Sequence, residues 1–183
     1  MNSSEPTSAR ARQAPLGEKY RENPSAAMIT DRGRTQNGTR TDPFHGEVVP
    51  GSQDYGLVWP FGIHFAVGGY HDGPNPGDLL CAAVATCLDS TIRIVADRMG
   101  VPLEHLAVDV TANVDVRGTL MLDRDVPVGF QTMRCHVDIQ PAASAKPEMV
   151  QKVLAVAERS CVNMQTLRAG LPVEVTTTVQ GMA

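Results

Sequence analysis

The sequence predicts an α+β protein built on antiparallel sheet, and three features carry that prediction. Residues 76–99 are apolar on nearly every side of a helix as far as Ile94, which is typical of a helix buried in a core. Residues 105–116 and 131–139 alternate apolar and polar side chains, as half-buried strands do. Strands are predicted both before and after the long helix, without a regular strand–helix–strand alternation. This order favours the α+β class.

The chain divides by composition into a polar arm, residues 1–27, and one domain, residues 28–183. Its 183 residues suit a single domain with an appendage. A short helix is expected at 16–22, ending at Asn23 because a residue before proline avoids the helical region. Arginines in the arm leave an organelle transit peptide open, whereas its glutamates favour a solvated arm.

Composition argues against several classes of partner. The net charge of -4 provides no basic surface for a nucleic acid. No apolar run approaches the roughly 20 residues of a membrane span, and the N-terminus lacks the apolar core of a secretory signal. Four cysteines are too few for a secreted disulfide framework. These features predict a cytoplasmic protein with reduced thiols and with neither nucleic-acid nor membrane partners.

Before the long helix, the sequence predicts three strands. Residues 28–36 and 44–50 have weak strand character and flank a turn-rich segment, which predicts a hairpin. Residues 62–69 place Ile63, Phe65 and Val67 on one side, as in a half-buried strand.

The long helix carries clear start and stop signals. Asn75 can cap it, Pro76 suits the first helical position, and Asp78 stands three residues after the cap. Gly100 ends it. A single sheet cannot cover a helix that is apolar on every side, so a second subunit is expected.

After the long helix and the strand pair, a second helix is expected to begin near Pro147. This helix, or a successor, continues to Gly170. Residues 171–179 alternate and predict a last strand.

The cysteines differ in what their surroundings indicate. Cys135 lies at strand period among apolar residues, which indicates packing. Cys81 and Cys87 are six positions apart, roughly 120° around a helix, so they are poor partners for each other. No metal-binding cysteine or histidine spacing appears. From composition alone, Cys87 and Cys161 would also be inert core residues.

Two motifs change that interpretation. The sequence resembles the osmotically inducible protein C and organic hydroperoxide resistance family over roughly residues 28–180. The first motif, N-P-x-x-L-L-x-A-x-x-x-x-C, is matched by Asn75, Pro76, Leu79, Leu80, Ala82 and Cys87. The second, C-x-x-x-x-T-L followed by P-V-x-V, is matched by Cys161, Thr166, Leu167, Pro172, Val173 and Val175. Two motifs in the same order are more specific than either alone.

The resemblance implies a fold and an activity. Members of this family are intertwined homodimers in which antiparallel sheets pack around long central helices. They reduce organic hydroperoxides with a thiol, at sites on the subunit interface. By this resemblance, Cys87 attacks the peroxide and becomes a sulfenic acid, and Cys161 condenses with it to a disulfide. A small dithiol or a lipoylated protein then reduces the disulfide, and no metal, haem or flavin takes part.

The activity requires a thiolate, whereas an ordinary cysteine, with a pKa of about 8.5, is mostly protonated near neutrality. The resemblance implies an arginine from the N-terminal strands, held by an acidic residue at the start of the long helix. The candidates are Arg32 and Arg34, with Arg40 a distant third, and Asp78 for the acid. Asp78 has an equally good alternative role in the helix cap.

The sequence departs from the family pattern in two places. Hydroperoxide resistance proteins usually carry glutamate ten residues before the first thiol, where this chain has Gly77. Many members have proline after the second thiol, where this chain has Val162. These departures indicate a divergent subgroup. Two alternatives to the peroxidase stay open: a non-catalytic small-molecule-binding or redox-sensing dimer, and a structural domain whose four cysteines are all core.

Overall fold

The computed structural model describes residues 8–36 and 41–179, and it confirms the α+β class. The elements, in chain order, are α1 (Ala9–Glu22), η1 (Pro24–Ala27), β1 (Gly33–Gln36), β2 (Gly46–Pro50), η2 (Gln53–Tyr55), β3 (Trp59–Phe61), η3 (Phe65–Val67), α2 (Pro76–Met99), β4 (Leu103–Asn113), α3 (Val116–Thr119), β5 (Thr132–Pro141), α4 (Pro147–Ser160) and α5 (Val162–Ala169).

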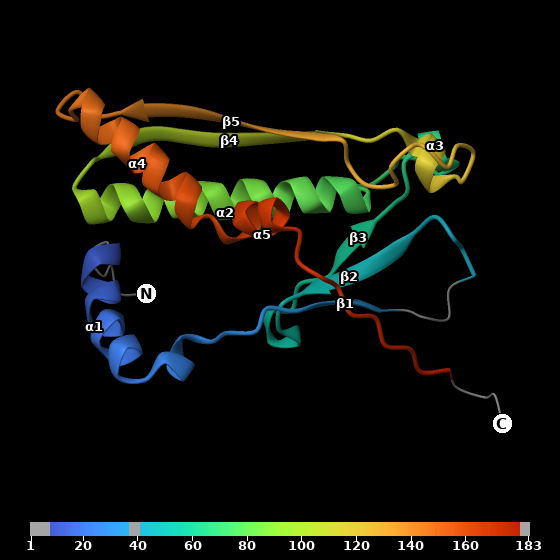
Figure 1. Ribbon diagram of the computed structural model, residues 1–183, viewed down its shortest axis with the longest axis horizontal. Helices are drawn as coiled ribbons and strands as arrows, with labels where there is room; N and C mark the ends of the chain where they lie inside the picture. Colours follow the sequence, from blue (N-terminus) through green and yellow to red (C-terminus); the bar gives the residue numbers. More distant parts are fainter. Residues whose placement is uncertain (1–7, 37–40, 180–183) are drawn as a thin grey trace.

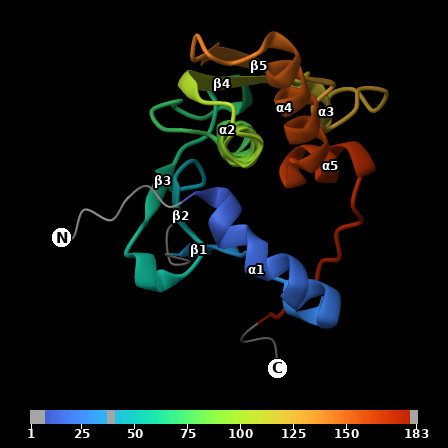
Figure 2. The same ribbon diagram turned by 90° about the vertical axis from the view of Figure 1, so that its left-hand side faces the viewer.

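Helix α2 is the axis of the molecule. The β4–β5 hairpin runs along one side of it, and α4 and α5 cross beside it (Figure 1). Viewed nearly along α2, the small β1–β2–β3 sheet and α1 lie on the opposite side from β4 and β5 (Figure 2). The structure therefore holds two separate antiparallel sheets with the long helix between them.

Both expected strand pairs are present, with β1, β2 and β4 shorter than the sequence predicts and β5 one residue longer. In the first sheet β1 pairs antiparallel with β2, and Arg34 lies opposite Val49. The first strand begins only at Gly33, because residues 28–32 have no ladder partner. In the second sheet β4 pairs with β5, and Cys135 lies opposite Val110. Val116, expected to end the first of these strands, instead begins the short helix α3.

The boundaries of α2 are the predicted ones. The Asn75 side chain accepts hydrogen bonds from the backbone N–H groups of Gly77 (2.8 Å) and Asp78 (3.2 Å). The Asp78 carboxylate accepts one from the Asn75 N–H at 2.9 Å, which completes a capping box. Gly100 closes the other end in the left-handed region, with φ of 66°.

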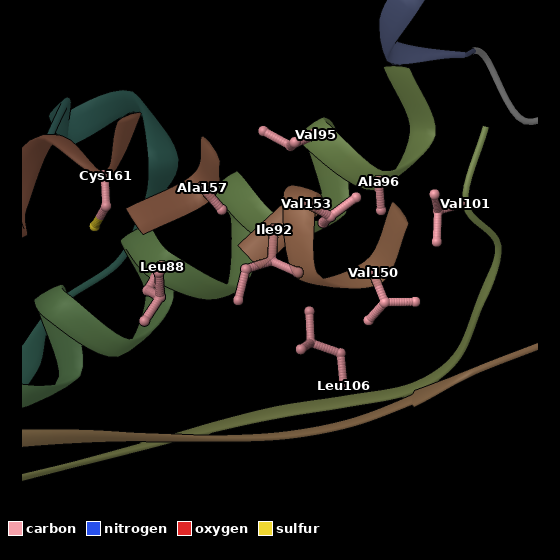
Figure 3. Packing of buried hydrophobic residues seen from close by; sticks show 10 residues of the cluster. All are labelled: Leu88, Ile92, Val95, Ala96, Val101, Leu106, Val150, Val153, Ala157 and Cys161. Carbon is pink, nitrogen blue, oxygen red and sulfur yellow. The ribbon is translucent and has the colours of Figure 1, made fainter. Parts of the chain in front are cut away.

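The core forms where α2, α4 and the β4–β5 sheet meet. Ile92 of α2 and Val153 of α4 are almost completely buried, at 1% and 0% exposure. Figure 3 shows the ten buried side chains of this cluster, which end at Cys161. Its members are Leu88, Ile92, Val95, Ala96, Val101, Leu106, Val150, Val153, Ala157 and Cys161.

The arm contains a longer helix than expected. Helix α1 ends at Glu22, as predicted, but it begins at Ala9 instead of residue 16 and contains Pro15. Ser8 caps it, and the Asp97 carboxylate of α2 accepts hydrogen bonds from Ser8 Oγ (3.2 Å) and the Arg10 N–H (3.3 Å). Asp97 therefore supplies an anion at the positive end of α1, which stabilises the start of that helix.

The strand predicted at 62–69 is wrong. Phe65–Val67 form a 3₁₀ turn, capped by the His64 ring nitrogen that accepts from the Ala66 N–H at 3.0 Å. Gly68 has φ of 90°, and a Cβ at Gly69 would overlap the Ile63 carbonyl. The two glycines fold the segment back on itself, and alternation in the sequence cannot reveal that.

The strand predicted at 171–179 is also absent from this chain. The segment makes no backbone hydrogen bond to any other described residue. Val173 and Val175 are more than four-fifths exposed. An alternating segment becomes a strand only beside another strand edge, and the described part of this chain offers it none.

Helix α2 is less enclosed than its sequence predicts. Its buried residues lie toward α4 and β4, whereas Leu80 and Ile94 are each 37% exposed. By length and composition alone α2 could also cross a membrane, contrary to the sequence expectation. The same properties fit a core helix, and α2 carries four of the ten residues of the buried cluster described above.

Candidate active site

Cys161 lies at the break between α4 and α5. Its φ and ψ of −72° and 107° interrupt the helix, and its side chain is completely buried. The Asn163 side chain donates a 2.7 Å hydrogen bond to the Ala83 carbonyl of α2, which fixes the start of α5 against that helix. The kink thus turns the Cys161 thiol toward α2.

Cys87 lies in the middle of α2, facing the same junction. It is partly buried and packs against the cluster that contains Cys161. The neighbouring Cys87 thiol is one of the groups that raise the pKa of Cys161. The structure therefore brings together the two thiols that the sequence singles out, from helices far apart in the chain, and both are free thiols.

Burial is the main cause that raises the pKa of Cys161, because an apolar surrounding penalises the thiolate. A backbone hydrogen bond from Met164 lowers that pKa, but burial outweighs it. Cys161 therefore remains protonated near neutral pH. That state suits a thiol that reacts second, since the thiolate is the form that attacks a peroxide.

The predicted arginines do not reach Cys87 within one chain. Arg34 lies in exposed β1, where its guanidinium donates to the Gln53 amide oxygen, with that amide turned to face it. Arg32 is exposed, and its carbonyl accepts from the Gly51 N–H at 2.8 Å. In both views β1 is well separated from α2 (Figures 1 and 2). Arg40 lies outside the described residues.

Asp78 likewise serves a different purpose in this chain. Its carboxylate is bound to the Asn75 N–H in the helix cap. It precedes Cys87 by nine residues, about 13.5 Å along a helix. Arg93, the arginine of α2 that is nearest to Cys87 in the sequence, forms an ion pair with Asp89 at 2.7 Å. Among the described residues, no cation interacts with Cys87.

Gly77 has a packing reason for being glycine. A Cβ there would lie 3.0 Å from the Phe130 ring and 2.9 Å from the Asn75 side chain. Any side chain at position 77 would therefore press on the Phe130 ring and on the Asn75 cap.

Sequence reasoning missed a cavity of about 1100 Å³ beside the N-terminal half of α2. Cys81 lines it, together with residues of the 63–71 segment, β4 and the connection to β5, whereas Cys87 and Cys161 do not. Burial is the main cause of the raised pKa of Cys81, and Asp78 raises it further. The six-residue spacing of Cys81 and Cys87 was the signal that these thiols face different surroundings.

Cys135 is partly buried and packs against the core, as its strand position predicts. Burial also raises the pKa of its thiol. No cluster of three histidine, cysteine, aspartate or glutamate side chains suited to a metal occurs in residues 8–36 and 41–179.

A long helix between two antiparallel sheets, with one thiol at its middle and a second at a helix break, defines a recognisable class of α+β protein. The sequence model of the OsmC-like protein family matches residues 69–176. The chain belongs to this family.

Solved structures share the fold at low identity. An OsmC-like protein from Mycoplasma pneumoniae has 13% identity and a TM-score of 0.59, covering 76% of this chain and 88% of that one. The organic hydroperoxide resistance protein OsmC from Legionella pneumophila has 22% identity and a TM-score of 0.57, covering 78% of this chain and 91% of that one. The organic hydroperoxide resistance protein OhrB of Bacillus subtilis has 19% identity and a TM-score of 0.50, covering 78% of this chain and 93% of that one. None of the curated proteins matches.

Proposed function

We propose that this protein is a cysteine-based peroxidase that reduces organic hydroperoxides to alcohols. The observation that carries the proposal is the meeting of Cys87, on α2, with the buried Cys161 thiol at the α4–α5 junction. Family membership and the hydroperoxide resistance proteins among its structural relatives agree with a redox role.

The reaction needs two thiols and an external reductant. The Cys87 thiolate attacks one peroxide oxygen, the O–O bond breaks, and the alkoxide leaves and takes up a proton to become an alcohol. Cys87 is then a sulfenic acid. The Cys161 sulfur attacks it, water leaves, and a Cys87–Cys161 disulfide forms. A dithiol or a lipoylated protein restores both thiols, so the proposal includes no metal, haem or flavin. We also propose that the protein acts in the reducing cytoplasm.

The test follows peroxide loss. We expect the reduced protein to consume cumene hydroperoxide catalytically with dithiothreitol, and Cys87→Ser to abolish turnover. Without dithiothreitol, Cys161→Ser should undergo a single oxidation that stops at the Cys87 sulfenic acid. Cys81→Ser, a change on the same helix outside the thiol pair, is the matched control and should retain activity. A stoichiometric disulfide without turnover would favour the redox sensor, and four unreactive thiols would favour the structural domain.

We further propose that the active form is a homodimer whose second chain supplies the activating arginine. Arg34 lies on β1, with Arg32 immediately before it, and β1 is well separated from α2 (Figure 1). Asp78 is held in the helix cap, although the reaction needs a thiolate at Cys87. The exposed apolar residues of α2 and of 171–179 provide surface for a second copy.

Mixed dimers test the origin of the arginine. One chain carries Cys87→Ser, and the other carries Arg32→Gln with Arg34→Gln, and each homodimer should be inactive. If the arginine comes from the partner, the mixed dimer regains one complete site and about half the wild-type activity. If the mixed dimer stays inactive while wild-type chains survive the same mixing, the arginine acts within its own chain.

A further inference from the structure

The segment before β2 holds a histidine between two carboxylates. His45 Nδ1 lies 2.6 Å from Asp42 Oδ2, and His45 Nε2 lies 3.0 Å from Asp72 Oδ2. The ring also stacks on Tyr70, with centroids 5.5 Å apart and an angle of 6° between the planes. A neutral imidazole donates from one nitrogen only, so both contacts are hydrogen bonds only when His45 is an imidazolium.

The two carboxylates belong to different parts of the fold. Asp42 and His45 immediately precede β2, whereas Asp72 lies in the 62–74 loop that leads into α2. That loop is closed at its ends by a 3.0 Å hydrogen bond from the Gly62 N–H to the Pro74 carbonyl. His45 therefore joins the first sheet to a compact loop of the kind that is often functional.

The same loop forms one wall of the cavity. Ile63, His64 and His71 line that cavity, and His71 immediately precedes Asp72. His71 has φ of 54°, in the left-handed region that residues other than glycine adopt uncommonly. Its ring is held against His64, with centroids 4.3 Å apart. A contact that fixes Asp72 consequently helps to hold this wall in its unusual shape.

We propose that His45 is a pH-dependent latch that fixes the 62–74 loop to the first sheet and so sets the shape of the cavity wall. The latch closes when the imidazole is protonated and bridges Asp42 and Asp72. It loosens when the imidazole loses its proton, because one carboxylate then faces a nitrogen lone pair. The inference does not depend on the proposed peroxidase.

The direction of the pH effect follows from the neighbours. The Asp42 hydrogen bond, and then that of Asp72, raise the pKa of His45 above its ordinary value of 6.5. Tyr70 is the other described titratable group that contacts the ring, and it stacks on the face. The latch is thus fully closed below pH 6.5 and opens as pH rises through the raised pKa.

Two measurements on the full chain test the latch. Nuclear magnetic resonance gives the pKa of His45, and hydrogen exchange gives the protection of the 62–74 loop between pH 6 and 9, corrected for intrinsic exchange. We expect a pKa above 6.5 that Asp72→Asn lowers. The opening constant of the loop should rise about tenfold for each unit by which the pKa is raised, because one unit is a tenfold change in equilibrium.

Matched variants separate the latch from general effects. His45→Phe keeps a ring on Tyr70 but removes the charge, and it should leave the loop weakly protected at every pH. His105→Phe, which removes an exposed histidine 3.5 Å from Asp138, should change nothing in the loop. Protection of β5 should stay constant throughout.

Two results would overturn the latch. One is an ordinary or lowered pKa for His45 in the wild-type protein. The other is loop protection that does not follow the titration of His45. Both are read on wild-type protein, so they decide the matter even if a variant fails to fold, and neither involves a peroxide.

Discussion

At the scale of single residues, four cysteines in one chain have distinct environments. Cys161 is completely buried, whereas Cys81, Cys87 and Cys135 are partly buried. Only the pair formed by Cys87 and Cys161 joins the middle of α2 to the α4–α5 break. The other two face β4 or lie on β5, so their thiols are explained by packing and by the wall of the cavity.

The raised pKa of Cys161 makes alkaline pH destabilising. Burial raises the pKa of Cys161 in the folded chain above the value of about 8.5 of an ordinary cysteine. As pH rises from that ordinary value toward the folded value, the unfolded chain releases this proton first, so the free energy of unfolding falls. Urea unfolding between pH 7.5 and 10 should show a shallower fall for Cys161→Ala than for wild type. Equal slopes would contradict the assignment of this proton to Cys161.

At the scale of elements, α2 is fixed by local chemistry. The capping box and the C-terminal glycine each depend on residues close together in the chain, so the sequence predicts both ends of α2. The 62–74 loop is different, because its shape depends on a glycine beside the Ile63 carbonyl and on a contact with His45 from another segment. A period-two alternation of apolar residues reveals neither the glycine contact nor the His45 contact.

Removing the cap should therefore weaken the whole molecule. Asn75→Ala deletes the acceptor for two α2 N–H groups and should lower the free energy of unfolding by about 1 kcal/mol. Asn75→Asp keeps a capping oxygen and is the matched control, measured by urea unfolding at pH 7. A full-sized loss in Asn75→Asp as well would show that the cap is not the cause.

At the scale of the whole molecule, the exposed apolar residues of 171–179 are the surface on which the proposed homodimer can be tested. These residues alternate as a strand does but have no strand beside them in the described part of the chain. A free alternating edge of this kind favours pairing with another chain. Leu80 and Ile94 on α2 are also partly exposed.

A charge in that segment should weaken the dimer. We expect wild-type protein to sediment as a dimer, and Val175→Asp to raise the dimer dissociation constant by desolvating a charge at the interface. Thr176→Asp, on the opposite face of the segment, is the matched control and should have a smaller effect. Analytical ultracentrifugation over a concentration series measures both, and a monomeric wild-type protein would refute the dimer.

The sequence by itself determined the class of fold, the ends of α2, the β4–β5 pair and the two thiols worth following, because each depends on neighbouring residues or on a regular period. Only the tertiary structure decided that Cys161 meets Cys87, that Arg32 and Arg34 remain remote from them, and that a cavity opens beside Cys81. Those facts depend on the kink at Cys161 and on the folding of the 62–74 loop. Such contacts join residues far apart in the chain, and no local pattern encodes them.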